Sequence, residues 1–598
     1  MAAPIRIANC SGFYGDRVSA AREMVEGGPI DVLTGDWLAE LTMLILARTR
    51  ASRSGGGYAR TFITQMEQVM GTCLDRSIKV VANAGGLDPP GCADAVAEVA
   101  DKLGLSPTIA YVNGDDLLPR LGDLIEGGVD FTHLDTGEPL GDPSRFITAN
   151  AYLGGWGIVE ALRRGADIVV TGRTTDAALT CGPAAWHHGW ARDDWDALAG
   201  AVVAGHIIEC GAQAAGGNYS FFTEVKGLTH TGFPWAEVAS DGSCVVGKHE
   251  GSGGEVSIGT VTSQLLYEIA SPAYLGPDVT ARFDTISLEQ VDVDRVRVHG
   301  VKGEPPPPTL KVAMNEQGGY RNDIALALTG LDIDAKAKLV EDAFWEACPY
   351  EPADFAHVSS KLVRTDKPDP ASNEEAVAVW RLTLKDPDER KVGRASSNAV
   401  IEMALATIPG FFGLSGGPSG GRAYGVYRPA SVPAELVPQH VVVVGAGATV
   451  VDSIAPVSGP VDVTPAPGPD AHAPDGTAVA APLGRVVGTR SGDKGGNANL
   501  GVFTRDDDAW TWLDTFLTVE RLRELLPETA GLEIDRYRFP ALRSLNFVIH
   551  GLLEEGVAAS TRQDPQAKGL GEWLRARVVD VPQGLLGARA AHGAGGAP

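Results

Sequence analysis

The sequence predicts an α/β protein: a large parallel or mixed sheet domain covered by helices, plus a small C-terminal α+β domain. Three observations predict this architecture. Over residues 1–180, short apolar runs alternate with helix-like segments, which is typical of a parallel sheet between layers of helices. A stretch rich in Pro, Gly and Ala near residues 456–482 is typical of an exposed linker. After this linker, strands and helices alternate on the smaller scale of a compact α+β domain.

The large domain begins with strand-like segments that each end in a polar, glycine-bearing loop. These segments are IRIANC (5–10), IDVLTGD (30–36), IKVVANAGG (78–86), TIAYVNGDD (108–116) and ADIVVTG (166–172). Helix-like segments follow several of them, and mixed strands and helices continue to residue 456. We expect one α/β domain over 1–456. The alternative is a division of this domain into two subdomains, about 1–280 and 281–456.

The rest of the chain is predicted as a linker over 457–481, a small domain over 482–582 and a flexible tail over 583–598. Within the small domain the order is strand, loop, strand, helix, strand, strand and helix. Its helix-like segments include VERLRELLP (519–527) and AKGLGEWLRAR (567–577).

Composition restricts the classes of partner. The formal net charge is −26 and the sequence pI is near 4.9, so the chain repels the phosphates of nucleic acids and anionic membrane surfaces. The apolar segment LAELTMLILA (38–47) contains Glu40 and is too short to span a bilayer. The seven cysteines form no C-x-x-C pair, which is typical of reduced thiols. We expect a cytoplasmic protein with neither nucleic acid nor membrane as a partner.

The carboxyl ends of the predicted strands form the first candidate site. In open parallel sheets, ligands bind outside these ends. Asp36, Asn83 with Gly85 and Gly86, and the TGRTTDAAL loop at 171–179 all follow such ends. Short polar residues also cap helices, but as a set these residues favour a shared ligand site.

Arg173 and Asp176 give the TGRTTDAAL loop two charges. Arg173 is suited to bind a carboxylate or phosphate, and Asp176 to act as an acid or base. The alternative is a structural ion pair at the start of the following helix.

The segment AGHIIECGAQAAGGNYS (204–220) supplies a second set of candidates. His206 and Glu209 are three residues apart, so they share one face of a predicted helix on which Cys210 and Gln213 follow, up to Gly216 and Gly217. A histidine beside a carboxylate is suited to general acid–base catalysis, and Cys210 is a candidate nucleophile. The alternative is a structural His–Glu pair on a half-buried helix. H-x-x-E-C lacks the zinc-binding H-E-x-x-H spacing.

Two further glycine clusters carry a cation. Lys248 precedes the loop that contains Gly253 and Gly254, and Arg422 follows a similar cluster, so each is a candidate anion site. None of these clusters has the spacing of a nucleotide-hydrolysis, dinucleotide-binding or hydrolase motif. We predict no metal and no bound cofactor.

The stretch RSGDKGGNANLGVF (490–503) is expected to form a long glycine-rich loop between strands. Asp493, Lys494 and Asn497 then either contact a ligand or fix the loop against the large domain, where glycine permits close approach. Arg490 and Asp493 are expected to pair.

Together, IANCSGFYGD, DVLTGDWLAELTM, HLDTGEPL, VVTGRTTDAAL, AGHIIECGAQAAGGNYS, GSGGEVS and QLLYEIASPAYLGPDV resemble the AtuA family of acyclic terpene utilisation proteins. RSGDKGGNANLGVF resembles the opening of that family's ferredoxin-like C-terminal domain. The resemblance covers nearly the whole chain in the right order. It implies a ferredoxin-like fold for the small domain.

The resemblance also implies a role in breaking down branched acyl-CoA intermediates of citronellol and geraniol. We therefore expect lyase or hydratase chemistry on a 3-hydroxyacyl-CoA or glutaryl-CoA-like thioester, with CoA as the substrate carrier. The alternative is a non-catalytic assembly or accessory subunit of an acyl-CoA carboxylase pathway. Either role is compatible with a homo-oligomer. Metal-dependent hydrolysis through Asp36, Asp115, Asp116 and Asp176 is disfavoured, because no ligand spacing joins them.

Overall fold

A computed structural model describes residues 3–52, 56–414, 420–453, 455, 457 and 477–586. The chain forms two compact units. The first contains residues 1–315, 427–557 and 564–598, and therefore includes the small C-terminal domain. The second contains residues 316–426 and 558–563.

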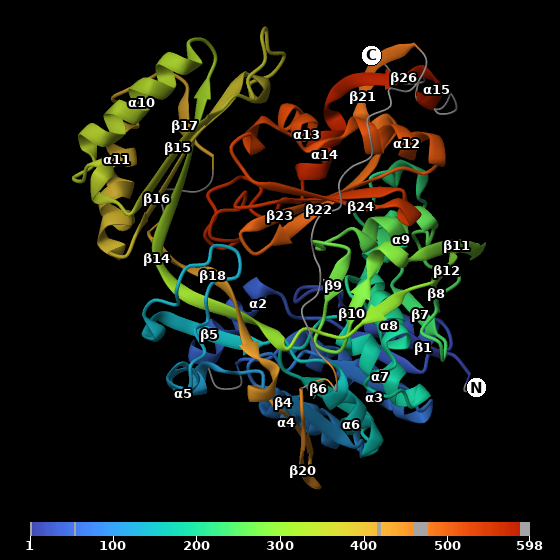
Figure 1. Cartoon of the computed structure of the whole chain (residues 1–598). Helices are drawn as coiled ribbons and strands as arrows, with labels where there is room; N and C mark the ends of the chain where they lie inside the picture. Colours follow the sequence, from blue (N-terminus) through green and yellow to red (C-terminus); the bar gives the residue numbers. More distant parts are fainter. Residues whose placement is uncertain are drawn as a thin grey trace. The chain divides into compact units, whose positions relative to one another are not determined.

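A large sheet organises the first unit (Figure 1). Its central strands run parallel in the order β1 (Ile5–Asn9), β2 (Val32–Gly35), β3 (Lys79–Ala82), β6 (Ile168–Thr171) and β4 (Ile109–Asn113). Antiparallel strands extend it on one side through β7 (Pro234–Val238), β8 (Cys244–Lys248), β12 (Arg295–His299) and β11 (Ser287–Asp292). On the other side lie β19 (Gln439–Val443) and β20 (Gly447–Val451). The predicted mixed α/β sheet is confirmed.

Helices cover both faces of this sheet because successive strand residues point to opposite faces. Ala8, Leu33 and Val80 pack with α1 (Ala20–Gly27), α3 (Arg60–Asp75) and α4 (Pro89–Leu103). The alternate residues Ile7, Val32 and Val81 share the other core with α6 (Trp156–Arg163), α7 (Ala178–His188) and α8 (Trp195–Ile208).

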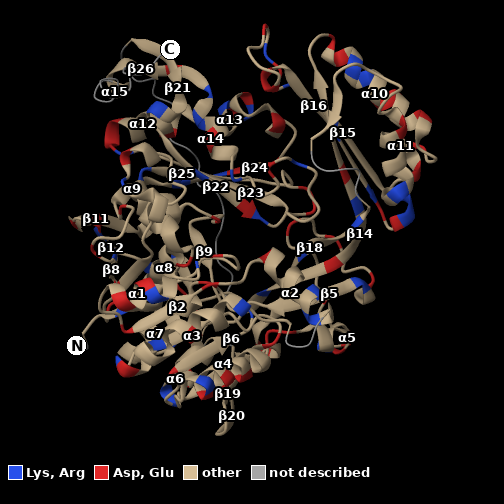
Figure 2. Ribbon diagram, turned by 180° about the vertical axis from the view of Figure 1, so that it is seen from behind, with Lys and Arg blue, Asp and Glu red and all other residues tan. Residues whose placement is uncertain are grey.

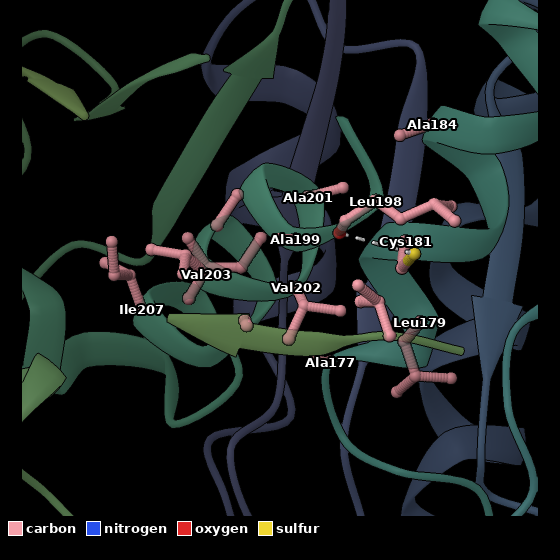
Figure 3. Packing of buried hydrophobic residues seen from close by; sticks show 14 of the residues in the cluster. Ala177, Leu179, Cys181, Ala184, Leu198, Ala199, Ala201, Val202, Val203 and Ile207 are labelled. Atoms are coloured by element: carbon pink, nitrogen blue, oxygen red, sulfur yellow. Dashed lines mark hydrogen bonds between the residues drawn. The ribbon is translucent and has the colours of Figure 1, made fainter. Parts of the chain in front are cut away.

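The packing of α7 against α8 is shown in Figure 3. Leu179 and Cys181 of α7 lie beside Leu198 and Val202 of α8, and the Cys181 Sγ is 3.9 Å from the Leu198 carbonyl oxygen. All seven cysteines are free, and all except the half-buried Cys210 are buried.

Shorter elements complete the large domain. They are α2 (Glu40–Ser52), α5 (Leu121–Glu126), α9 (Ile258–Leu265), β5 (Phe146–Ala151), and the three-stranded sheet of β9 (Ala273–Leu275), β10 (Thr280–Arg282) and β13 (Lys302–Glu304). None of the helices in the described parts of the chain combines the length and apolar character needed to cross a bilayer.

The small domain is an antiparallel sheet in the order β22 (Gly488–Lys494), β23 (Asn497–Phe503), β25 (Ser544–Ile549) and β24 (Ile534–Phe539). The helices α12 (Asp507–Phe516), α13 (Val519–Leu525) and α14 (Leu570–Ala576) share a core with one face of this sheet. The opposite face contributes Phe503, Tyr537, Phe539 and Val548 to the core of the large domain. A two-stranded sheet of β21 (Ala478–Pro482) and β26 (Val578–Pro582) adjoins it.

The predicted long loop at 490–503 is wrong. Residues up to Lys494 belong to β22 and residues from Asn497 to β23, so only Gly495 and Gly496 form the turn. The glycines serve close packing of the strands. A Cβ on Gly492 would lie 2.6 Å from the Tyr267 ring, and one on Gly501 would lie 2.5 Å from the Leu266 Cβ.

The second unit has its own sheet and core. Part of β14 (Thr309–Thr329) pairs with β16 (Val377–Asp386), which pairs with β15 (His357–Val363), and β17 (Phe411–Gly413) and β18 (Arg422–Pro433) also pair with β14. The helices α10 (Ile333–Ala347) and α11 (Ser396–Met403) share the apolar core of this sheet. Lys residues and Asp and Glu residues both lie along α10 in Figure 2.

The predicted linker at 457–481 lies mostly outside the described residues. The predicted tail from 583 begins with a short helix, α15 (Gln583–Leu586), and the residues after it also lie outside the described part of the chain.

Candidate functional site

The carboxyl ends of neighbouring parallel strands bring three predicted site residues together. Asp36 follows β2, Asn83 follows β3, and Asp176 lies in the loop after β6. The Asn83 Nδ2 donates to the Asp36 Oδ1 at 2.5 Å, and burial and repulsion by the neighbouring Asp176 carboxyl group raise the pKa of Asp36.

Arg173 lies against the carboxyl pair and is 2% exposed. Its Nη2 donates to the Asp176 Oδ1 at 2.5 Å, and its guanidinium carbon is 4.4 Å from the centre of the Tyr152 ring. Its Nε and Nη1 are buried and have no hydrogen-bond partner among the described residues. An unpaired buried donor costs about 1–3 kcal/mol, so the guanidinium is well suited to receive an anionic ligand group.

The surrounding carboxyl groups favour their protonated forms. Burial raises the pKa of Asp36 and of Glu209 well above the ordinary value, and repulsion by Asp176 raises both further. Burial also raises the pKa of Asp176, although Arg173 opposes this. The Asp176 side chain retains 28% exposure, so solvent reaches the cluster. Burial therefore shifts these three groups toward the protonated form, which is the form that donates a proton.

The predicted helix over His206 to Gln213 is wrong beyond Ile208, where α8 ends. Gly211 takes a left-handed φ of 60°, and a 3₁₀ turn (Gly211–Ala215) follows. A Cβ on Gly211 would lie 2.6 Å from the Phe233 ring, so close packing accounts for glycine at this position.

His206 and Glu209 remain neighbours across the end of α8. The His206 Nδ1 is 3.4 Å from the Glu209 Oε1, and the imidazole ring packs against Tyr274 and Phe283 with centroid distances of 5.3 Å. Burial lowers the pKa of His206 to about 4, so its ring is neutral at neutral pH. The Glu209 Oε2 is buried and has no hydrogen-bond partner among the described residues.

Cys210 follows directly. Burial and the nearby Glu209 raise the pKa of its thiol well above the ordinary value. A thiolate is the nucleophilic form of cysteine, so this environment disfavours nucleophilic attack by Cys210.

Close packing of the chain accounts for glycine at the positions that were predicted to bind a ligand. A Cβ on Gly85 would lie 2.6 Å from the Thr171 carbonyl oxygen, and Gly86 takes a φ of 53° beside Leu46. Gly216, Gly217, Gly253 and Gly254 are likewise crowded by backbone or side-chain atoms.

The other two predicted cations already have partners. The Lys248 Nζ is 3.0 Å from the Asp294 Oδ2 and donates to the Ser252 carbonyl oxygen at 2.8 Å. Arg422 belongs to the second unit, where its Nη2 is 2.7 Å from an Asp323 oxygen.

The small domain contributes Arg490, Asp493 and Asn497 through the hairpin of β22 and β23. Arg490 donates to the Gln213 side chain and lies 4.1 Å from the centre of the Tyr267 ring. The predicted Arg490–Asp493 pair is wrong, because the Asp493 Oδ1 lies 3.3 Å from the Lys568 Nζ. The Asn497 Nδ2 donates to the Asp135 Oδ1 at 3.0 Å and anchors the hairpin to the large domain.

The backbone of residues 266–270, just after α9, is held by two buried asparagines of the small domain. The Asn499 Oδ1 accepts from the Glu268 N–H at 2.8 Å, and the Asn499 Nδ2 donates to the Leu266 carbonyl oxygen at 3.1 Å. The Asn546 Nδ2 donates to the Ala270 carbonyl oxygen at 2.7 Å. Between these contacts Glu268 adopts a left-handed φ of 57°, a strained conformation of the kind that clusters at functional sites.

Lys311, Glu40 and Tyr152 complete the surroundings from distant parts of the chain. The Lys311 Nζ is 3.4 Å from the Glu40 Oε1 and 5.2 Å from the centre of the Tyr152 ring. Glu40 stands in the quoted motif DVLTGDWLAELTM, whereas no quoted motif contains Tyr152 or Lys311. Tyr267 and Glu268 stand in the quoted motif QLLYEIASPAYLGPDV, which was the available signal.

A separate cavity of about 340 Å³ lies between the large and small domains of the first unit. Tyr219, Ile258, Phe503, Arg505 and Arg543 are among the residues that line it. No group of three or more His, Cys, Asp or Glu side chains in the described ranges is arranged to hold a metal ion.

Comparison with known sequences gives two family matches. The family described as acyclic terpene utilisation family protein AtuA matches residues 5–443, and the AtuA ferredoxin-like domain matches residues 481–580. No curated protein matches the chain.

Proposed function

Because the chain belongs to the AtuA family of acyclic terpene utilisation proteins, we propose that it is an enzyme of branched acyl-CoA catabolism. The proposed chemistry is of the lyase or hydratase type on a 3-hydroxyacyl or glutaryl-like thioester. Family membership supports the pathway, and the buried cluster around Arg173 supports a catalytic role.

The observation that carries the proposal is the pair of unpartnered Arg173 donors beside acids of raised pKa. A glutaryl-type acyl group ends in a free carboxylate, which can accept a charge-assisted hydrogen bond from a buried guanidinium. An oxygen of that carboxylate would satisfy one of the two unpartnered donors, Nε or Nη1, and its charge would balance that of Arg173. A simple acyl chain offers no such group.

The protonated carboxyl groups suit both reaction types. In a hydratase, an acid protonates the departing 3-hydroxyl group. In a lyase, it donates a hydrogen bond to the thioester oxygen as negative charge develops there. We assign this role to the Asp36–Asp176 pair and to Glu209, with the neutral His206 as the neighbour that positions Glu209.

The test compares CoA thioesters with and without a terminal carboxylate. Thermal unfolding is measured with CoA, butyryl-CoA, glutaryl-CoA and 3-hydroxy-3-methylglutaryl-CoA, and turnover is followed by mass spectrometry. A ligand at about one hundred times its dissociation constant stabilises the fold by about 2.7 kcal/mol. We expect glutaryl-type thioesters to raise the midpoint more than butyryl-CoA, and Arg173→Gln to abolish that difference.

Arg173→Lys serves as the matched control, because it keeps the charge but not the planar set of guanidinium donors. It should retain folding and bind the carboxylate more weakly than the native protein. If no thioester shifts the midpoint or is turned over, the enzyme proposal fails and the accessory-subunit alternative gains.

A further inference from the structure

Lys494 stands at the end of β22, where the small domain meets the large one. Its Nζ donates to the Glu268 carbonyl oxygen at 3.0 Å. Within the described ranges, no carboxylate lies within ion-pair distance of this amine. A half-buried lysine without a counter-ion differs from Lys568 nearby, whose Nζ lies 3.3 Å from Asp493 and 3.6 Å from Glu268.

The charges around the amine come from several elements. Those that face it are Lys311 on β14, Glu40 on α2, Asp135, Glu268 after α9, and His206 and Glu209 at the end of α8. Burial and the neighbouring Lys311 ammonium lower the pKa of Lys494, and the carboxylates oppose this only in part. A lysine that is buried beside a second cation is the usual arrangement for an uncharged, reactive amine.

The two-residue turn fixes the position of Lys494. Gly495 has a φ of 63°, and its backbone lies against Tyr427 and Asp135. A Cβ on Gly496 would lie 2.4 Å from the Glu554 carbonyl oxygen. Because both turn residues are tightly packed, Lys494 is presented by a rigid hairpin that docks on the large domain.

We propose that Lys494 of the small domain is a catalytic residue, the general base of the site formed by the large domain. This inference rests on the proposed function, because it supplies the base that the acids around Arg173 lack. The small domain thereby completes the active site.

The step is balanced without a co-reactant. The neutral Lys494 amine takes the proton of the substrate 3-hydroxyl group, and the oxygen lone pair forms the carbonyl of the released ketone. The Cα–Cβ bond breaks, and its electron pair moves to the thioester carbonyl as an enolate. A protonated carboxyl group of the Asp36–Asp176 pair hydrogen-bonds to the enolate oxygen. Transfer of the lysine's new proton to the α-carbon regenerates the amine and gives the shortened acyl thioester.

The first test needs no substrate. The rate at which Lys494 in the full-length protein reacts with acetic anhydride is measured by peptide mass spectrometry between pH 6 and 11. We expect its midpoint to lie at least about one pH unit below the value of about 10.4 for a lysine in an unstructured peptide. A midpoint at or above that value overturns the proposal whatever the fate of the proposed function.

The second test uses turnover of the thioester found above. Lys494→Arg places a permanently charged group there that cannot act as a base, and we expect a loss of about 100-fold or more. Lys494→Met checks the same loss without charge, and Lys102→Met on the exposed face of α4 is the control that should leave turnover unchanged. Thermal unfolding confirms that each variant folds. Turnover by a folded Lys494→Arg variant within about three-fold of the native rate overturns the proposal.

Discussion

Arg173 illustrates how an acidic protein with a net charge of −26 keeps a cation buried. The guanidinium pairs with Asp176 and stacks on Tyr152, so its charge is partly balanced. Coulombic attraction by Asp176 and Asp36 raises its pKa, so it stays charged. Its Nε and Nη1 have no hydrogen-bond partner among the described residues.

The raised pKa of Asp115 predicts that the stability of the fold depends on pH. Burial raises its pKa to about 7, whereas an unfolded aspartate titrates near 3.9. Between these values the folded state holds a proton that the unfolded state has lost. The contribution of this proton to the free energy of unfolding is therefore complete below about pH 4. It is lost as the pH rises to about 7, at up to about 1.4 kcal/mol per pH unit.

The measurement is urea unfolding at pH 5, 6, 7 and 8. Asp278, with a pKa raised to about 6, acts in the same direction, whereas His206 opposes both between about pH 4 and 6.5 because its folded pKa is lowered. Comparing the native protein with Asp115→Asn isolates the effect of Asp115. The free energy of unfolding of the variant should fall less steeply with rising pH than that of the native protein. Asp101→Asn on the exposed side of α4 is the control. Equal slopes in all three proteins would contradict the prediction.

At this scale, prediction from sequence works where a residue follows a buried strand. Asp36, Asn83 and Asp176 stand at such ends, and the parallel register brings them together. Glu40, Tyr152 and Lys311 could not be found in this way, because they reach the site through tertiary packing of α2 and β14. The ionisation states were equally hidden, because burial decides them.

At the scale of elements, the β22–β23 hairpin depends on glycine for its docking. Gly501 is buried against the segment after α9, where a Cβ would lie 2.5 Å from the Leu266 Cβ. Leu266 cannot move freely, because its carbonyl oxygen accepts from Asn499. The contact joins the Gly501 backbone to the Leu266 Cβ, whose position the Leu266 backbone fixes.

We therefore expect Gly501→Ala to lower the free energy of unfolding by about 1–3 kcal/mol, as overpacking of a close interface does. The measurement is denaturant unfolding followed by circular dichroism. Gly531→Ala is the matched control, since nothing lies within 4 Å of the position of its added Cβ. Equal stability of the two variants would show that the interface accommodates a methyl group.

The hairpin also shows what sequence patterns miss at this scale. Turns are rich in glycine and asparagine, so RSGDKGGNAN predicts a loop. In the structure the same residues form strands, because Gly492 and Gly501 permit close approach and Asn499 pairs with backbone across the domain interface. A local sequence pattern does not distinguish a glycine in a turn from a glycine in a strand that packs closely against another segment.

For the first unit as a whole, the small domain shares a core with the large one. Four side chains project from the sheet of the small domain into the core of the large domain: Phe503, Tyr537, Phe539 and Val548. Asn499 and Asn546 are 0% exposed and bind the backbone of residues 266–270. Undocking would expose the apolar side chains and leave buried polar groups unpaired.

We predict that the small domain and the central sheet lose protection together. Hydrogen exchange in increasing urea should give the amides of β23 and of β2 the same opening free energy within about 1 kcal/mol, because the shared core makes them one cooperative unit. Asn546→Ala removes the donor to Ala270 and leaves that buried carbonyl unpaired, so it should make β23 open about 1–3 kcal/mol more easily than β2. If β23 already opens well before β2 in the native protein, the two domains separate in solution. The amine of Lys494 would then lie beside Glu268 only part of the time, and turnover would fall in urea before the central sheet unfolds.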